Sequence, residues 1–251
     1  MKPAYVSGVG LWAPGFANVE AWLAGAPDAN VTEPKPALIA PKLVRRTSFL
    51  TRMAADVLAQ AQAGSDLGQV MTVYASANGE IRTLAALLEM LRGDGIYSPI
   101  RFQNSVHNTA AGHLSIATAN ANFTSSIGGG EESVAMGVLE AMTLLDDRGG
   151  EVIAVFADES PGDDFGLPPF APLACALHLS ATSCPSGLSL SGLRPSSAAQ
   201  TKRAGHGLAE NPCAAALHLL ERIGRGEPGT VPLSFGARSW SVDLSLEGPS
   251  R

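Results

Sequence analysis

The sequence predicts an α/β protein in which helices pack on a layered sheet. Strand and helix patterns alternate along the chain up to about residue 160, an order typical of folds with helices covering a sheet. Val152–Ala157 is a continuous apolar run, as expected of a strand covered on both faces. Apolar residues make up 45% of the 251 residues and charged residues 16%, so the chain can bury a sizeable core.

The first segments predict a strand, a loop and a long helix. Tyr5–Leu11 is a strand pattern that runs into a Gly-rich turn, and Val19–Ala24 is a short helix candidate. The proline-rich stretch Pro27–Pro41 predicts a loop. In Thr47–Ala63 helix formers dominate and apolar residues recur at steps of four, which predicts an amphipathic helix with one buried face.

The middle of the chain continues the alternation. Val70–Ala75 is a β-rich run, and Ile81–Leu91 is a strongly apolar helix candidate. The next segments predict a helix over His113–Ala121, a strand over Phe123–Ile127 and a long helix over Glu132–Leu145.

After residue 160 the pattern changes. Ala174–Ser180 and Leu188–Leu193 predict two strands paired with each other. Residues 195–212 are rich in Ser, Ala, Gly and Pro and predict a loop. Ala214–Ile223 predicts a helix, and Val231–Leu246 ends the chain with strand-like runs.

Charge and composition argue against several classes of protein. The net charge is −6 and no basic block is longer than the pair Arg45–Arg46, whereas a nucleic-acid-binding surface needs a basic face. The sequence contains no apolar run of about 18 residues, so no membrane span is predicted. The start Met1–Val6 does not resemble a signal peptide. The three cysteines form no CxxC pair, so neither disulfides nor a zinc or other metal site are expected, and the cytoplasm is the expected location.

Two glycine motifs follow predicted strands. Gly8 and Gly10 do not complete a G-x-G-x-x-G motif, because the next glycine is Gly15, and we interpret them as a tight turn rather than a dinucleotide site. Gly128–Gly130 lies between a strand and a helix, where anions often bind, but Glu131–Glu132 would repel a phosphate. The second motif therefore predicts a strand–turn–helix elbow, a position where many folds hold a nucleophile.

Around this elbow the sequence resembles the β-ketoacyl synthases of the thiolase-like superfamily. The most specific similarity is Asn108–Ile116, an N-x-A-A-G-x-x-S-I segment that precedes the nucleophile in that family. The opening strand Val6–Gly10 and the strand Glu151–Ala157 are also similar. The resemblance implies one thiolase-like layered α/β/α domain over residues 1–251, with residues 1–160 largely complete and residues 161–251 a reduced, truncated second half.

The departures from the family concern its catalytic residues. Members carry T-A-C-x-S-G at the elbow, whereas this chain has Gly128–Glu132, with Gly129 nearest the cysteine position. The family's H-G-T-x-T motif is absent, and only His206 lies in a segment similar to the family's K-x-x-x-G-H. The three cysteines lie far downstream of the elbow and are not expected to replace the nucleophile.

Candidate site residues follow from this alignment. The elbow and an acyl channel would be formed by Asn108, Gly112, His113, Gly128, Gly129 and Gly130. His113 is also explained as a helix-terminal residue bonded to backbone, and His107 as a loop residue near the same cleft. The pair Glu131–Glu132 is explained most simply as helix-capping groups, and Asp158–Glu159 as part of a solvated loop.

The resemblance implies a subunit without catalysis of its own, of the chain-length-factor type, which pairs with an active ketosynthase in bacterial fatty-acid or polyketide-like (aryl polyene) biosynthesis. Family members dimerise through the strand before the elbow, here Asn122, Phe123, Thr124, Ser125, Ser126 and Ile127. An acyl carrier protein is a further candidate partner, a second copy of the chain could replace the synthase, and no cofactor is implied.

Two alternatives stay open. The chain could be a divergent condensing or decarboxylating enzyme that acts on carrier-bound acyl groups through Glu131 or His206. It could also be a homodimeric binder of acyl carrier protein, although two acidic proteins repel each other at long range.

Overall fold

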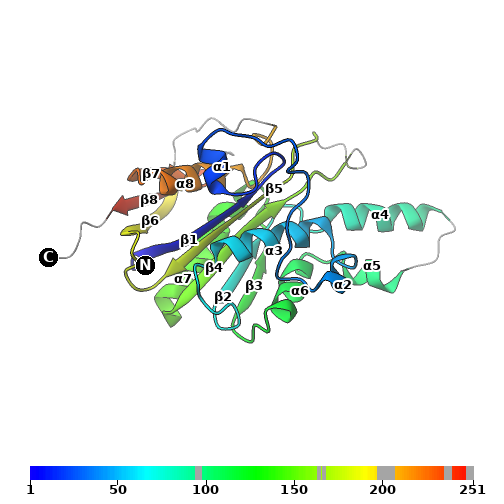
Figure 1. The fold of residues 1–251 in the computed structure, drawn as a ribbon, viewed down its shortest axis with the longest axis horizontal. Coiled ribbons are helices and arrows are strands. Elements are labelled where there is room, and N and C mark those ends of the chain that lie inside the picture. The colour runs from blue at the N-terminus through cyan, green and yellow to red at the C-terminus, as the bar shows by residue number, and fades with distance from the viewer. Residues whose placement is uncertain (94–97, 163–164, 166–167, 197–206, 235–238, 247–251) are drawn as a thin grey trace.

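An eight-stranded mixed sheet forms the centre of the molecule (Figure 1). The computed structural model describes residues 1–93, 98–162, 165, 168–196, 207–234 and 239–246. The sheet order is β3-β2-β4-β5-β1-β6-β8-β7. The strands are β1 (Ala4–Trp12), β2 (Met71–Ala75), β3 (Thr124–Ile127), β4 (Glu151–Asp158), β5 (Leu173–Ser180), β6 (Leu188–Ser196), β7 (Gly229–Pro232) and β8 (Ser239–Leu246).

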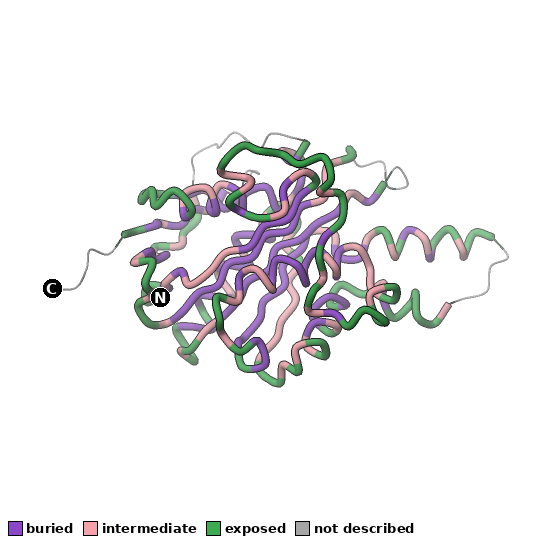
Figure 2. The backbone as a smooth tube through the Cα atoms, in the orientation of Figure 1, coloured by how far each residue is buried: buried purple, intermediate pink, exposed green. Residues whose placement is uncertain are grey.

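Helices cover both faces of this sheet. They are α1 (Val19–Leu23), α2 (Pro41–Val44), α3 (Phe49–Ala61), α4 (Ile81–Arg92), α5 (Pro99–Gln103), α6 (Thr109–Ala117), the 3₁₀ helix η1 (Gly130–Glu132), α7 (Ser133–Arg148) and α8 (Ala214–Gly224). The apolar faces of α3 and α6 pack on one side and those of α7 and α8 on the other. Figure 2 shows the strands between them as the most buried part of the chain. The predicted α/β/α layering is confirmed.

The parallel part of the sheet lies at one edge. β2 pairs in parallel with β3 and with β4, and the other strand pairs are antiparallel. Strand β4 is buried from Val152 to Asp158, in agreement with its apolar sequence. Since β3 is the last strand at its edge, only one of its sides is paired within the described chain. The carboxyl ends of β2, β3 and β4 therefore meet at one place, where the elbow lies.

The glycines of β1 have a different role from the predicted one. Gly8 and Gly10 lie inside the strand and not in a turn. A Cβ at Gly8 would overlap the carbonyl oxygen of Ala61, and one at Gly10 would overlap that of Val57. Helix α3 thus lies directly against the backbone of β1, and side chains at these positions would push the two elements apart.

Several predicted element bounds and pairings were wrong. Helix α6 begins at Thr109 and ends at Ala117, four residues earlier than expected at each end, and it ends before Ala119, which adopts a left-handed φ of 51°. Strands β5 and β6 do not pair with each other, because β1 lies between them in the sheet. The helices α2 and α5 were not predicted, although each has a proline in its first turn and α5 is capped by Ser98.

Among the residues described here, no helix is long and apolar enough to cross a membrane. The described part of the chain also contains no group of three His, Cys, Asp or Glu residues placed to hold a metal ion.

Candidate functional site

The elbow between β3 and α7 has the predicted strand–turn–helix geometry. Gly130 adopts a left-handed φ of +57°, which glycine accommodates without a side-chain clash. The hydroxyl of Ser133 accepts a hydrogen bond from the Gly129 amide (3.1 Å) and donates one to the Gly130 carbonyl (2.8 Å). Glu132 makes no side-chain capping bond, so the expected capping role of Glu132 is wrong; Ser133 closes the turn in its place.

The imidazole of His107 fills the space beside the elbow. Its Nε2 lies 3.0 Å from the Ser76 carbonyl, a distance that fits donation from Nε2–H. A Cβ on Gly79 would lie 2.8 Å from the His107 ring, and one on Gly128 would lie 3.3 Å from it. The cavity left beside His107, between α3, β2 and α6, measures only about 20 Å³. In the single chain this space is about one water molecule in size, and no acyl chain fits there.

Three other residues predicted for an acyl channel lie at the start of α6 and within it. Asn108 precedes α6, is exposed and makes no side-chain capping bond, and Gly112 faces open space on the same helix. His113 is half-buried; its Nε2 lies 3.1 Å from Oδ1 of Asn104, and burial lowers the pKa of its imidazole. The channel assigned to these residues therefore stays a prediction for the assembled protein. His206 lies outside the described residues.

A buried carboxylate holds the turn beneath the elbow. Asp158, at the carboxyl end of β4, accepts hydrogen bonds from the Ser76 hydroxyl (2.8 Å) and from the amides of Ala77 (2.8 Å) and Asn78 (2.9 Å). The thiol of Cys213 lies 3.1 Å from its second oxygen and donates to it. Burial raises the pKa of Asp158, and these hydrogen bonds oppose the increase. Asp158 and its neighbour are buried, so their assignment to a solvated loop is wrong.

None of the three cysteines is placed to act as a nucleophile. Cys175 and Cys213 are fully buried, and burial raises the pKa of both thiols, which keeps them protonated. Cys184 is half-buried beside Ser7, near the amino end of β4 and thus at the opposite end of the sheet from the elbow. The elbow itself offers glycine backbone and the exposed carboxylate of Glu131.

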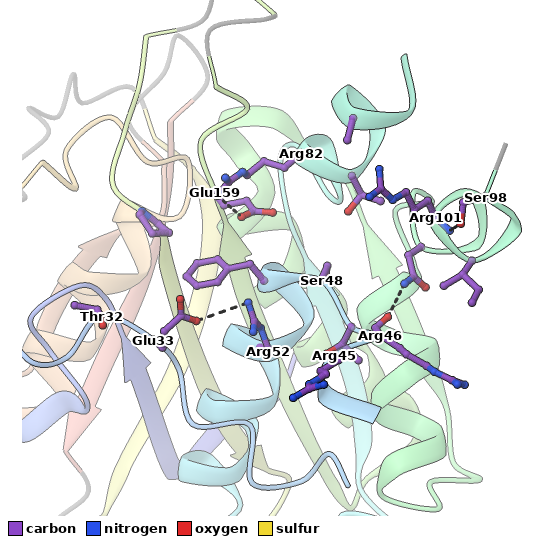
Figure 3. Close-up of a pocket in the computed structure, with 17 residues that line it drawn as sticks. Thr32, Glu33, Arg45, Arg46, Ser48, Arg52, Arg82, Ser98, Arg101 and Glu159 are labelled. Carbon is purple, nitrogen blue, oxygen red and sulfur yellow. Dashed lines mark hydrogen bonds and ion pairs between the residues drawn. The ribbon is translucent and has the colours of Figure 1, made fainter. Parts of the chain in front are cut away.

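A larger cavity than the one beside His107 was not predicted, and no elbow residue lines it. It measures about 900 Å³ and is lined by the α2–α3 junction, the first turns of α4, and α5 (Figure 3). Five arginines line it, namely Arg45, Arg46, Arg52, Arg82 and Arg101. The sequence does not indicate this arginine cluster, because only two of the five arginines are adjacent in the chain.

One buried carboxylate, Glu159, lines this cavity, and a second, Glu80, bonds to the lining residues Ser48 and Thr83. Glu80 accepts hydrogen bonds from Ser48 (2.6 Å), Thr51 (3.2 Å) and Thr83 (3.1 Å), and burial raises its pKa. Glu159 is 2% exposed and lies 3.5 Å from Arg82. Burial raises the pKa of Glu159 to about 7; Arg82 lowers it and Glu80 raises it further.

Comparison with known proteins gives both a family and a fold. A family model described as the β-ketoacyl synthase N-terminal domain matches residues 20–241. A search of curated proteins finds no match. Among solved structures, the ketosynthase ApeO in complex with its chain length factor ApeC from Xenorhabdus doucetiae matches with a TM-score of 0.76. The identity is 24%, and the match covers 97% of this chain and 100% of that chain.

Two further structures give the same result. The ishigamide ketosynthase/chain length factor matches with a TM-score of 0.73 and 12% identity, over 98% of this chain and 100% of that one. AntDE:AntF, a type II acyl-carrier protein in complex with its ketosynthase, matches with a TM-score of 0.77 and 11% identity, over 98% and 99% of the two chains. The thiolase-like fold of the ketosynthases is thus confirmed for this chain.

Proposed function

Because this chain belongs to the β-ketoacyl synthase N-terminal domain family, we propose that it is a non-catalytic subunit that pairs with an active ketosynthase. In this role it acts as a chain-length factor and helps to shape the cavity that holds the growing acyl chain. The observation that carries the proposal is the elbow, where glycine backbone and His107 stand in place of a reactive cysteine.

The edge strand β3 supports pairing with a second subunit. The carbonyls of Phe123 and Ile127 accept hydrogen bonds from the amides of Thr72 in β2 and of Ser76, which follows β2. Because backbone groups alternate in direction along a strand, those of Thr124 and Ser126 point to the free edge. A second subunit can bond to this edge through Asn122–Ile127, which would extend the sheet from one subunit into the next.

Exposed apolar side chains gather on the segments next to this edge in sequence. Of the eleven large hydrophobic residues exposed in the described chain, seven lie between α4 and the end of α6: Leu84, Leu88, Leu91, Ile100, Phe102, Val106 and Ile116. In Figure 1, α4 and α5 extend to the right of the sheet, beyond α6. Such an apolar surface is typical of a protein interface, so it supports burial against a partner subunit.

The structural neighbours support the same assembly. Two of them are complexes or pairs of a ketosynthase with a chain length factor, and a third holds an acyl-carrier protein with its ketosynthase. For this chain we propose an active ketosynthase as the main partner, an acyl carrier protein as a transient one, and a bacterial fatty-acid or aryl-polyene type of pathway.

Reconstitution of chain elongation tests this function. The co-encoded ketosynthase is assayed with a carrier-bound starter and extender unit, with and without this chain, and the product lengths are determined by mass spectrometry. We expect elongation to a defined length only when both proteins are present. Elongation by the ketosynthase alone to the same length would contradict the proposal.

A decarboxylation assay separates the proposal from the enzymatic alternative. Malonyl-carrier protein is incubated with the isolated wild-type chain and with Glu131→Gln. The non-catalytic assignment predicts no release of CO₂ above the uncatalysed rate in either sample, because Glu131 is exposed at an elbow with no nucleophile beside it. Turnover by the wild type that Glu131→Gln reduces at least tenfold would establish the enzyme instead.

A further inference from the structure

The cavity between α3 and α5 concentrates positive charge in an acidic protein. Five of the chain's 17 Lys and Arg residues line it, against two glutamates, Glu33 and Glu159, whereas the whole chain has a net charge of −6. Figure 3 shows Arg82 and Arg101 on one side of the cavity and Arg45, Arg46 and Arg52 on the other. This cavity therefore attracts anions, although the protein as a whole repels them.

The carboxylates of the described cavity wall neutralise only part of this charge. Arg52 lies 3.7 Å from Glu33, and Arg82 lies 3.5 Å from Glu159. Arg45, Arg46 and Arg101 form no ion pair with a carboxylate among the described residues; the side chain of Arg101 contacts the sulfur of Met90. Three guanidinium groups thus remain available to an anionic ligand.

The two walls of the cavity are joined, which holds the arginines in place. Asn104, which follows α5, is buried and donates a hydrogen bond from Nδ2 to the carbonyl of Arg46 at 2.7 Å. Its Oδ1 contacts His113 of α6 at 3.1 Å. At the start of α5, the Ser98 hydroxyl accepts a bond from the Arg101 amide. Binding an anion therefore requires little reorganisation of the backbone around Arg46 and Arg101.

The size and lining of the cavity indicate which anion it takes. A volume of about 900 Å³ is typical of sites for small organic molecules and is far larger than an inorganic phosphate. Phe49, Ala86, Ile100 and Pro172 provide apolar surface for an organic group. A guanidinium group forms paired hydrogen bonds with phosphate or carboxylate oxygens, and three unpaired arginines match the two charges of a phosphate better than one carboxylate.

We propose that this cavity is a binding site for an organic phosphate, with the phosphate at the arginines and the organic group against Phe49 and Pro172. The site is separate from the elbow and does not depend on the subunit role proposed above. Its binding would give the subunit a small-molecule ligand of its own.

Isothermal titration calorimetry with a matched set of probes tests the site. The probes are 1-naphthyl phosphate, 1-naphthoate, 1-naphthol, inorganic phosphate and a polyglutamate peptide. We expect 1-naphthyl phosphate to bind at a 1:1 ratio and at least tenfold more tightly than each of the others. Equal affinity for 1-naphthoate or inorganic phosphate, tightest binding of the peptide, or no binding of 1-naphthyl phosphate would overturn the proposal.

Variants locate the binding site. Arg46→Gln combined with Arg101→Gln should weaken binding of 1-naphthyl phosphate at least tenfold, while Arg225→Gln, an exposed arginine that follows α8, should change it less than twofold. Thermal unfolding followed by circular dichroism checks that both variants fold. Unchanged affinity in the folded double variant would contradict the assignment.

Discussion

His107 and two glycines determine what the elbow can hold. The sequence alignment predicts that Gly129 stands nearest the nucleophile position, and this assignment stays a prediction. His107 was expected in a loop near this cleft, but its contacts were not predictable, because it precedes Gly128 by 21 residues and reaches the elbow only through the fold. Its ring contacts the backbone of Ser76 and packs against Gly79. The elbow is therefore closed by a side chain from outside the motif.

The burial of two acidic residues was also not predictable from the sequence. Asp158 and Glu159 end a strand and precede a polar stretch, a pattern in which acidic residues are usually solvated. Their burial depends on partners distant in sequence, namely the amides after β2 for Asp158 and Arg82 of α4 for Glu159. Because the sequence pattern does not contain these contacts, it predicted a solvated environment for two residues that are buried.

Glu159 makes the stability of the protein depend on pH. Its pKa rises from 4.5 to about 7 on folding, so between these values the folded state holds more protons than the unfolded state. The free energy of unfolding therefore falls as the pH rises from about 4.5 to about 7. We expect Glu159→Gln to unfold at higher denaturant concentration than the wild type at pH 8, with a gain of about 2 kcal/mol.

The two proteins should differ little at pH 4.5, where Glu159 is protonated in the folded state and about half protonated in the unfolded state. Urea unfolding at the two pH values measures the effect. A loss of stability on Glu159→Gln at pH 8 would show that the ion pair with Arg82 outweighs the burial of the carboxylate.

At the scale of elements, the periodicity of apolar residues predicted the helices and strands whose bounds are set by local sequence. The strand β4, the helix α3 and the helix α7 have long and regular patterns, and their bounds agree with the prediction within three residues. The pairing of the strands was harder to predict from the sequence, because the order of β5, β1 and β6 depends on how the whole sheet assembles. The predicted start of α6 at His113 was four residues too late, because the helix begins at Thr109.

The contact between α3 and β1 gives a prediction at this scale. Gly10→Ala should destabilise the protein by about 3 kcal/mol, because the new methyl group would meet the rigid carbonyl of Val57. Gly112→Ala is the matched control: Gly112 lies within α6, is exposed and has no neighbour near its Cβ position. This change should stabilise the protein by about 0.5–1 kcal/mol.

Both variants are compared by urea unfolding monitored by circular dichroism. Equal stability of Gly10→Ala and the wild type would mean that α3 does not lie directly against β1.

At the scale of the molecule, one end of the sheet carries both features that a paired subunit needs. Among the described strands, β3 is paired on one side only, and the exposed apolar residues of α4–α6 follow β2 and precede β3 in the chain. The elbow connects β3 to α7, so the inert turn and the proposed interface are parts of one structural unit. The family resemblance predicted this arrangement, whereas the apolar surface became visible only in the structure.

The mass of the complex in solution tests this account most directly. Size-exclusion chromatography with light scattering is applied to the chain mixed with its co-encoded ketosynthase, using wild type, Ser126→Pro and Ser126→Ala. Proline removes the amide that points to the free edge of β3, whereas alanine keeps it. We predict a stable complex, with the mass of one 25.8 kDa chain added to the synthase, for wild type and Ser126→Ala but not for Ser126→Pro. Elution of the wild-type chain separately from the synthase would contradict the central claim.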